Sequence, residues 1–364
     1  MALAEVMSET GRYDEGEPLI RDALRIRRAH LGTSHPDVAA SIEALGINYY
    51  ERGQYDQAVP NLRLALAMRR DMHPDGHPLL AQAIGNLAYA LLDQGNYEEV
   101  ERLQRESLAL KRRLYGAAHR EIATDLNNLA YTLQLRGDYA GAERFYRDAL
   151  AMNRQLLGAE HPEVAANENN LALVLYRKGD RAGAVELMRH VLASYRASLG
   201  VDHPNVAAVA ANLAYWLIGV GRYDESAQLV DQSLAIRERA LGKDHPQVAG
   251  TLTVKARLML ATGRYDEARR LAAEAQRILG ASLPDDHWQM AAARSVEGGA
   301  LARQGRFEEA ERLLLQSQPA LGASPIPDLQ DRGRERLHAL YLAWGKPAEA
   351  AKYATAGGAS ATAR

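Results

Sequence analysis

The sequence predicts an all-α protein, a solenoid of stacked antiparallel helix pairs. The first observation behind this is a glycine that recurs every 42 residues, and the second is an aromatic residue two positions after most of these glycines. A fixed period of this size marks repeated units that each cover the apolar face of a neighbour. The recurring glycines are Gly11, Gly53, Gly95, Gly137, Gly179, Gly221, Gly263 and Gly305, with Gly345 following after 40 residues.

Residues 203 to 240 show how one repeat is built. Pro204 suits the first position of a helix, where its missing N–H costs nothing. Apolar residues then follow at helical spacing from Val206 to Val220. Gly221 can take the left-handed conformation that often ends a helix, and a second amphipathic stretch begins at Tyr223. Each repeat is therefore predicted to be two helices joined by a short turn.

The same register organises residues 1–355 as one array of repeats. A truncated unit at 1–30 begins inside a helix, and seven full units fill about 36–321. A capping unit at about 327–355 follows, with a helix from about Asp328 to Trp344 and a short one ending near Thr355. We expect the tail, 356–364, to be disordered. The full units are predicted to start near Pro36, Pro78, Arg120, Pro162, Pro204, Pro246 and Trp288.

Composition excludes several classes of function. A formal net charge of −2 and a pI near 6.6 give no basic surface for nucleic acid. Without cysteine the chain has no disulfide and no thiolate metal site. No apolar run is long enough to cross a membrane, and the first residues do not resemble a signal peptide. We expect a cytoplasmic protein without a membrane partner.

No enzyme motif is present, and no cofactor is expected. The sequence lacks HExxH, GxxxxGK[ST] and GxSxG. Histidines recur with the repeat, but a metal needs its ligands about 2 Å away, and stacked repeats hold these side chains too far apart. We expect them to cap or pack at the loop-to-helix junctions. These histidines are His35, His77, His119, His161, His203, His245 and His287.

Each repeat resembles a tetratricopeptide repeat. The fourth unit carries the signature in Leu129-Ala130, Gly137, Tyr139, Ala142 and Ala149. The 42-residue length, with LGAEHPEVA, LGVDHPNVA and LGKDHPQVA between units, is similar to the kinesin light chain subtype, here in a bacterial type. The resemblance implies a right-handed superhelix whose first helices line a concave groove for extended peptides. Bacterial chains of this subtype often form regulatory parts of larger proteins, including serine/threonine kinases.

The resemblance also places the groove, at the residues ten, six and three before each turn glycine. An Asn amide there can both donate to and accept from a peptide backbone, and Tyr gives contact area at low entropy cost. The alternative is that these side chains only tolerate exposure or pack between first helices. The groove candidates are Asn127, Asn169, Tyr89, Tyr131, Tyr215, Tyr176 and Arg257.

Two further sets of residues, asparagines and basic clusters, recur at fixed positions of the repeat. Four asparagines lie nine before the turn glycine, and we expect them to form a hydrogen-bonded ladder between adjacent helices, with partner contact as the alternative. Basic clusters near the ends of second helices suit the helix dipole, which predicts a solvated face, with a phosphate-binding or acidic-partner patch as the alternative. The asparagines are Asn86, Asn128, Asn170 and Asn212, and the clusters are Arg69-Arg70, 111–113, and Arg237 with Arg239.

These observations predict a non-enzymatic scaffold that binds an extended segment of a protein partner. A second interpretation is a C-terminal regulatory segment of a larger signalling protein, such as a bacterial serine/threonine kinase. It is motivated by the truncated first helix, which leaves an apolar edge that solenoids normally cap. A third interpretation is end-to-end self-association through that edge.

Overall fold

The computed structural model describes residues 7, 10–324 and 326–354, and in these residues all regular secondary structure is helical. The expected disordered tail and most of the truncated first helix lie outside them. The chain divides into two compact units, Met1–Ala184 and Val185–Arg364. The boundary falls inside a helix, α10 (Arg181–Leu199), so repeats occur in both units.

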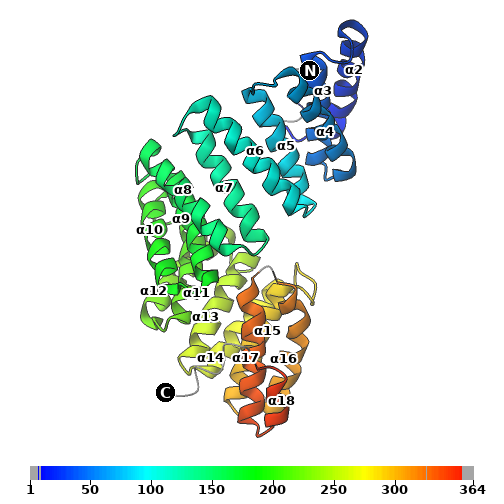
Figure 1. The fold of residues 1–364 in the computed structure, drawn as a ribbon. Helices are drawn as coiled ribbons and strands as arrows, with labels where there is room; N and C mark the ends of the chain where they lie inside the picture. The colour runs from blue at the N-terminus through cyan, green and yellow to red at the C-terminus, as the bar shows by residue number, and fades with distance from the viewer. Residues whose placement is uncertain (1–6, 8–9, 325, 355–364) are drawn as a thin grey trace. The chain divides into compact units, whose positions relative to one another are not determined.

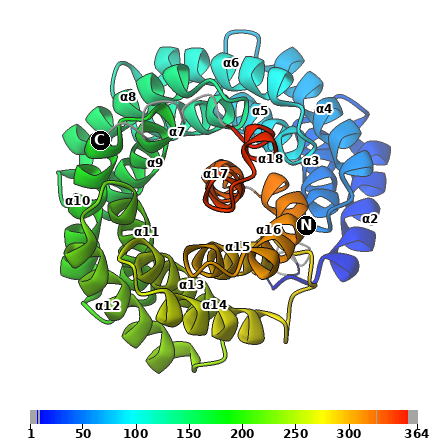
Figure 2. The ribbon, with the colours of Figure 1, turned by 90° about the horizontal axis from the view of Figure 1, so that it is seen from below.

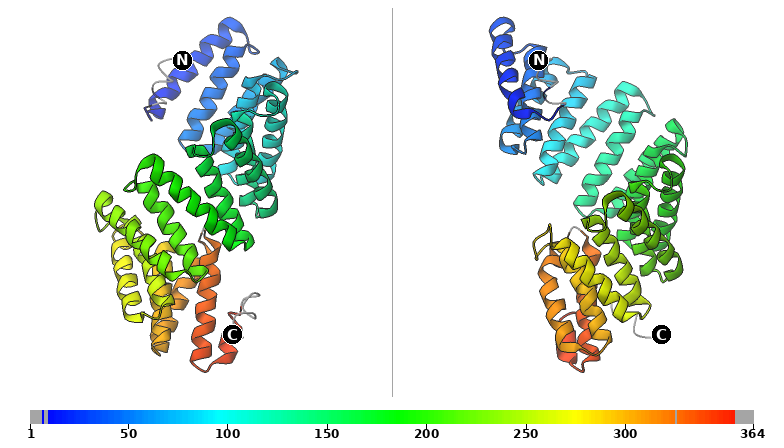
Figure 3. Two further views of the ribbon diagram at one scale, coloured as in Figure 1. Left: turned by 90° about the vertical axis from the view of Figure 1, so that its left-hand side faces the viewer. Right: turned by 180° about the vertical axis from the view of Figure 1, so that it is seen from behind.

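Antiparallel helix pairs fill each unit (Figures 1 and 3). The first helices are α3 (Pro36–Glu51), α5 (Pro78–Asp93), α7 (Arg120–Leu135), α9 (Pro162–Lys178), α11 (Pro204–Gly219), α13 (Pro246–Ala261) and α15 (Trp288–Arg303). The second helices are α4 (Tyr55–Met72), α6 (Tyr97–Tyr115), α8 (Tyr139–Leu157), α10, α12 (Tyr223–Leu241), α14 (Tyr265–Leu279) and α16 (Phe307–Gly322). Before them lies α2 (Tyr13–Leu31), and after them lie α17 (Pro327–Ala343) and α18 (Pro347–Ala351).

The seven first helices begin at the residues that the repeat register indicates, and the turn glycines explain where they end. All nine glycines of the 42-residue series have positive φ, between 70° and 92°. A residue with a Cβ rarely adopts this conformation, so glycine is favoured at the turn. At the end of the chain the short helix α18 stops at Ala351, a few residues before the expected end.

The seven in-register histidines cap the first helices. In each case Nδ1 of the histidine accepts a hydrogen bond from the backbone N–H two residues later, at 3.1–3.2 Å. This bond satisfies one of the N–H groups that a helix leaves without an intrahelical partner. The prediction that these histidines cap is confirmed. No group of three or more metal-ligating side chains occurs among the described residues.

Polar bonds connect consecutive repeats where a second helix meets the next first helix. Each bond joins side chains 14 positions apart in the sequence, at 2.6–2.8 Å. We call this set the inter-repeat seam. It comprises Arg27 with Ser41, Lys111 with Asp125 and Asn153 with Asn167 in the first unit, and Arg237 with Thr251 in the second.

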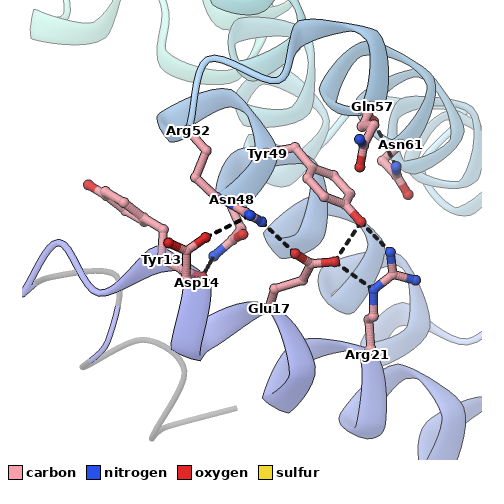
Figure 4. A network of polar contacts seen from close by, with 9 residues as sticks. All are labelled: Tyr13, Asp14, Glu17, Arg21, Asn48, Tyr49, Arg52, Gln57 and Asn61. Atoms are coloured by element: carbon pink, nitrogen blue, oxygen red, sulfur yellow. Dashed lines mark hydrogen bonds and ion pairs between the residues drawn. The ribbon is translucent and has the colours of Figure 1, made fainter.

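A denser polar network holds α2 against α3 (Figure 4). The carboxylate of Glu17 accepts bonds from Arg21 at 2.8 Å and from the Tyr49 hydroxyl at 3.0 Å, and it pairs with Arg52. The bond from Arg21 is the main reason that the pKa of Glu17 is lowered. Nearby, Asn48 donates to the backbone oxygen of Tyr13 at 2.9 Å. Helix α2 is thus attached to α3 by specific bonds as well as by apolar packing.

Apolar side chains between the helices form the core of each unit. In the first unit one cluster runs from Ile20 in α2 to Leu110 in α6. In the second unit, Leu301 of α15 and Leu314 of α16 pack with Leu337 of α17 in another. No helix among the described residues has the length and apolar character needed to cross a membrane.

Replacing one histidine cap tests its contribution to stability. We expect His203→Ala to lower the free energy of unfolding by about 1 kcal/mol, because the N–H of Asn205 loses its acceptor. His203→Asn is expected to keep most of the stability, since Asn is also a good N-cap residue. Urea denaturation followed by circular dichroism measures both. An unchanged midpoint for His203→Ala would contradict the capping role.

Candidate functional site

Four large apolar side chains follow one another at 42-residue spacing on the first helices of the first unit. Tyr89 is 48% exposed and Tyr131 is 44% exposed, although both are large and aromatic. Their equivalents Ile47 and Leu173 are half-buried. We call these four residues the first-unit face. Exposed aromatic groups in a row are typical of a surface that contacts another molecule.

Amide side chains fix the helices beside this face. Asn128 donates to the Tyr89 hydroxyl at 3.1 Å, and Asn86 donates to Glu43 at 2.8 Å. Asn170 donates to the Oδ1 of Asn127 at 3.2 Å. Each of these three donors therefore bonds to the first helix of the preceding repeat. Three of the four asparagines expected to form a ladder thus bond across to a neighbouring first helix. They bond to Glu43, Tyr89 and Asn127, and not to one another.

The remaining asparagines of the two predicted sets behave differently. The Oδ1 of Asn127 also accepts from Asn167 at 3.0 Å, so its oxygen serves the packing of α7 against α9. Asn212 is exposed and makes no side-chain hydrogen bond within the described residues, and thus does not extend the ladder. Asn169 is half-buried and also lacks such a bond in the described part of the chain. Of the two groove asparagines, Asn127 therefore uses its oxygen within the protein, and Asn169 uses neither atom of its amide among the described residues.

A small recess lies beside Tyr89. Its lining includes Gly85, Gln104 and Asn128, and its volume is about 20 Å³. A Cβ at Gly85 would meet no atom within 4 Å. The Oε1 atom of Gln104 is buried and accepts no hydrogen bond among the described residues. The recess therefore combines open space of about one water molecule with an acceptor for an N–H donor.

In the second unit, the chain's own helix α17 covers the equivalent positions. The Tyr215 hydroxyl donates to Asp328 of α17 at 2.6 Å. The Arg257 guanidinium lies 3.8 Å from the centroid of the Tyr215 ring, and Arg257 is only 6% exposed. A Cβ on Gly299, the next residue in this register, would come within 3.2 Å of Arg336 in α17. Figure 2 shows α17 on the side lined by α11, α13 and α15.

Burial and charge shift the pKa values of Tyr215 and Asp328, the two residues that join α11 to α17. Burial is the main cause that raises the pKa of Tyr215 to about 12. Burial also opposes the charge of Asp328, but the guanidinium of Arg332 and the Tyr215 hydroxyl outweigh it, so the pKa of Asp328 is lowered. Arg332 donates to Asp328 at 2.9 Å. The N-terminal half of α17 is therefore held by a carboxylate that prefers its ionised form.

Three groove candidates are thus absent from the open surface. Tyr215 and Arg257 are covered by α17, a contact that the repeat register does not encode. Tyr176 is 8% exposed, and its ring lies 5.9 Å from Arg181, which stands where other repeats carry the turn aromatic. The candidates that remain accessible are Tyr89, Tyr131, and in part Asn127 and Asn169.

The basic clusters are also less solvated than expected. Arg69 is 4% exposed and pairs with buried Glu43, while Lys111 bonds to Asp125 and Glu121. Burial opposes the charge of Lys111, yet these carboxylates raise its pKa. Lys111 and Arg237 are committed to the contact with the next repeat, whereas Arg69 pairs with the first helix of its own repeat. For Lys111 and Arg237, the sequence signal for this contact was the acidic or hydroxyl residue 14 positions after the cation.

Neutralising Asp328 tests how α17 is held. Asp328→Asn is expected to weaken the attachment of the N-terminal half of α17 by about 1.5 kcal/mol, because hydrogen bonds to a charged group are lost. The backbone amides of 328–336 would then exchange with deuterium roughly tenfold faster. Asp331→Asn, at an exposed position of the same helix, is the control. Equal exchange in the two variants would contradict the role of Asp328.

The attachment of α17 through Asp328 is expected to depend on pH. Because the pKa of Asp328 is lowered in the folded protein, its contribution is complete above the unfolded value of about 3.9 and is lost as pH falls through the folded value. We therefore expect amides of 328–336 to lose protection on acidification to below about pH 4 in the native chain, and to lose less in Asp328→Asn. Equal acid sensitivity of both chains would show that another group is responsible.

Comparison with known proteins agrees with this architecture. The tetratricopeptide repeat model matches residues 1–71, 79–155, 126–197, 163–225 and 206–281, and a second tetratricopeptide repeat model matches 291–316. No protein of curated function matches the sequence.

Solved structures with similar folds include the apo form of RapI, with a TM-score of 0.68 and 12% identity over 97% of this chain and 93% of that chain. BtubC (BKLC) from P. vanneervenii has a TM-score of 0.55 and 22% identity over 62% of this chain and 91% of that chain. Repeats of a putative kinesin light chain from Podosopora anserina have a TM-score of 0.48 and 26% identity, over 57% of this chain and 98% of that chain. The repeat signature, the helix pairs and the family models together show that the chain belongs to the tetratricopeptide repeat family, whose members are protein-interaction scaffolds.

Proposed function

We propose that the first-unit face binds an extended segment of a partner polypeptide. The single observation that carries this proposal is the exposure of Tyr89 and Tyr131 on consecutive first helices. Two tyrosines give large contact area with few rotatable bonds, which favours them at binding surfaces.

Polar groups beside the tyrosines supply hydrogen bonds for a peptide backbone. The amide of Asn169 can donate and accept. Such bonds recognise the backbone whatever the partner's side chains, while the recess at Gly85 admits one small group. In the second unit, α17 covers Tyr215 and Arg257, which occupy the equivalent positions.

The most specific test fills the recess without disturbing the fold. Gly85→Leu places a side chain where a Cβ meets no atom within 4 Å, and glycine inside a helix costs about 1 kcal/mol relative to alanine. The variant is therefore expected to be as stable as the native protein. We expect peptides selected on the native chain from a random phage-displayed library to bind Gly85→Leu at least about tenfold more weakly.

A matched glycine provides the control. Gly250 in α13 also has open space at its Cβ position, and it lies in the second unit. Gly250→Leu should bind the selected peptides like the native chain, whereas Tyr89→Ala and Tyr131→Ala should each lose affinity. Selected peptides that bind Gly85→Leu and both tyrosine variants at native affinity would refute the assignment of this face.

A further inference from the structure

Two carboxylates lie one helical turn beyond residues of the first-unit face. Glu51 follows Ile47 by four residues on α3. In the same register, Asp93 follows Tyr89 by four residues on α5. Residues four apart share one face of a helix, with about 5–6 Å between their Cβ atoms. Both carboxylates are exposed, so a polypeptide that lies on the first-unit face passes within reach of them.

Neither carboxylate forms an ion pair with a described residue. The hydroxyl of Tyr50 donates to Asp93 at 2.9 Å. The hydroxyl of Tyr13 donates to Glu51 at 3.4 Å. Arg52 is adjacent to Glu51 in the sequence, but its guanidinium pairs with two carboxylates of α2. Two negative charges at this edge of the face are therefore balanced only by neutral donors.

The buried carboxylates on the first helices of this unit show the contrast. Each of them pairs with a cation on a second helix, at 2.6–3.4 Å. These pairs are Glu43 with Arg69, Asp125 with Lys111 and Glu168 with Arg154. The packing of the helices thus uses paired carboxylates, and Glu51 and Asp93 belong to no such pair.

The positions of the two carboxylates are unfavourable for the helices that carry them. Glu51 is the last residue of α3, and Asp93 is the last residue of α5. The C-terminal end of a helix carries partial negative charge, which favours a cation there and disfavours a carboxylate. Neither helix has a basic residue in its last turn, whereas α9 ends with Arg177 and Lys178. Residues that oppose a local rule without compensation indicate a role outside the fold.

The pKa of Tyr50 reflects the same negative charge. Burial is the main cause that raises this pKa to about 12, followed by the hydrogen bond to Asp93. The charges of Asp93 and Glu51 raise it further. Both carboxylates therefore act on one hydroxyl, between the ends of α3 and α5.

A polar hollow opens beside this tyrosine. The ring of Tyr55 lies 6.0 Å from the ring of Tyr50, and Tyr55 lines a hollow of about 300 Å³. Asp56 and three glutamines complete the polar lining, and one of them, Gln94, is the residue after Asp93. No basic residue lines the hollow. It offers carboxylate and amide oxygens to a donor, in a volume several times the roughly 30 Å³ of one water molecule.

We propose that the partner segment on the first-unit face presents an arginine side chain to Asp93 and Glu51. This inference rests on the proposed function, because the partner must lie on that face for its side chain to reach them. A guanidinium can make two parallel bonds to a carboxylate and can stack on an aromatic ring, and Tyr50 and Tyr55 are adjacent.

The register also limits where this arginine lies along the partner. The equivalent position on α7 is Leu135, which is 39% exposed. An apolar side chain of the partner is favoured there, since it covers Leu135 from water. The arginine of the partner is therefore expected at the α3 and α5 end of the face, with an apolar residue toward α7.

Peptide selection on the native full chain tests the arginine contact. Peptides selected from a random phage-displayed library are expected to be enriched in arginine. Replacing that arginine by alanine in a selected peptide should weaken binding about tenfold. The double variant Glu51→Gln with Asp93→Asn should bind the unaltered peptide about tenfold more weakly, and should bind the two peptides about equally, because the contact is already lost. Both losses should shrink in about 0.5 M sodium chloride, which screens exposed charges.

A second double variant controls for net charge. Asp71→Asn with Asp148→Asn removes the same charge from exposed positions of α4 and α8, and should leave the affinity within about twofold. The Glu51→Gln and Asp93→Asn variant is expected to melt at or above the native temperature, because carboxylates at helix C-terminal ends are unfavourable. A clearly lower melting temperature would show that the two carboxylates serve the fold, and would overturn the proposal.

Tyr89→Ala separates this inference from the function on which it rests. Peptides that lose affinity in Tyr89→Ala but not in Glu51→Gln with Asp93→Asn would overturn the arginine contact and leave the binding face in place. Equal losses in the two double variants would show a general attraction between charges, and would also overturn the contact. Peptides that bind Tyr89→Ala at native affinity, or a selection that yields no peptide, would refute the face and the arginine contact together.

Discussion

Contact between the second helix of one repeat and the first helix of the next is the interaction on which the rest of the structure depends. A single helix pair leaves one apolar face uncovered, and the next pair covers it. Polar bonds of the inter-repeat seam add a geometric requirement to this packing, because they join side chains 14 positions apart at 2.6–2.8 Å. Buried polar partners of this kind are costly when misaligned, so they favour one alignment of the helices.

This alignment also determines what the first helices present to a partner. In the first unit, residues at one repeat position include the exposed Tyr89 and Tyr131. In the second unit, α17 lies against Tyr215, which occupies the same position, and closes it with a charged contact. The same repeat position therefore forms an open surface in one unit and an internal contact in the other.

Much of the fold could be predicted from the sequence, because glycine and histidine act locally. The turn glycines require positive φ, and the histidines cap the helix that follows them, so the helix boundaries follow from residues within a few positions. The candidate site could be predicted only in part. The burial of Arg257 depends on α17, more than 60 residues later, and no local pattern signals that contact. Similarly, Asn127 occupies an expected groove position, but its oxygen bonds to Asn167 and Asn170.

The first unit thus carries the open face, and in the second unit α17 covers the equivalent positions. Hydroxyl-radical footprinting of the native full chain, analysed by mass spectrometry, measures the accessibility of individual tyrosines directly. We expect rapid modification of Tyr89 and Tyr131. We expect protection of Tyr176, which is buried, and of Tyr215, which α17 covers. Modification of Tyr215 as fast as that of Tyr131 would show that α17 does not cover this position of the second unit.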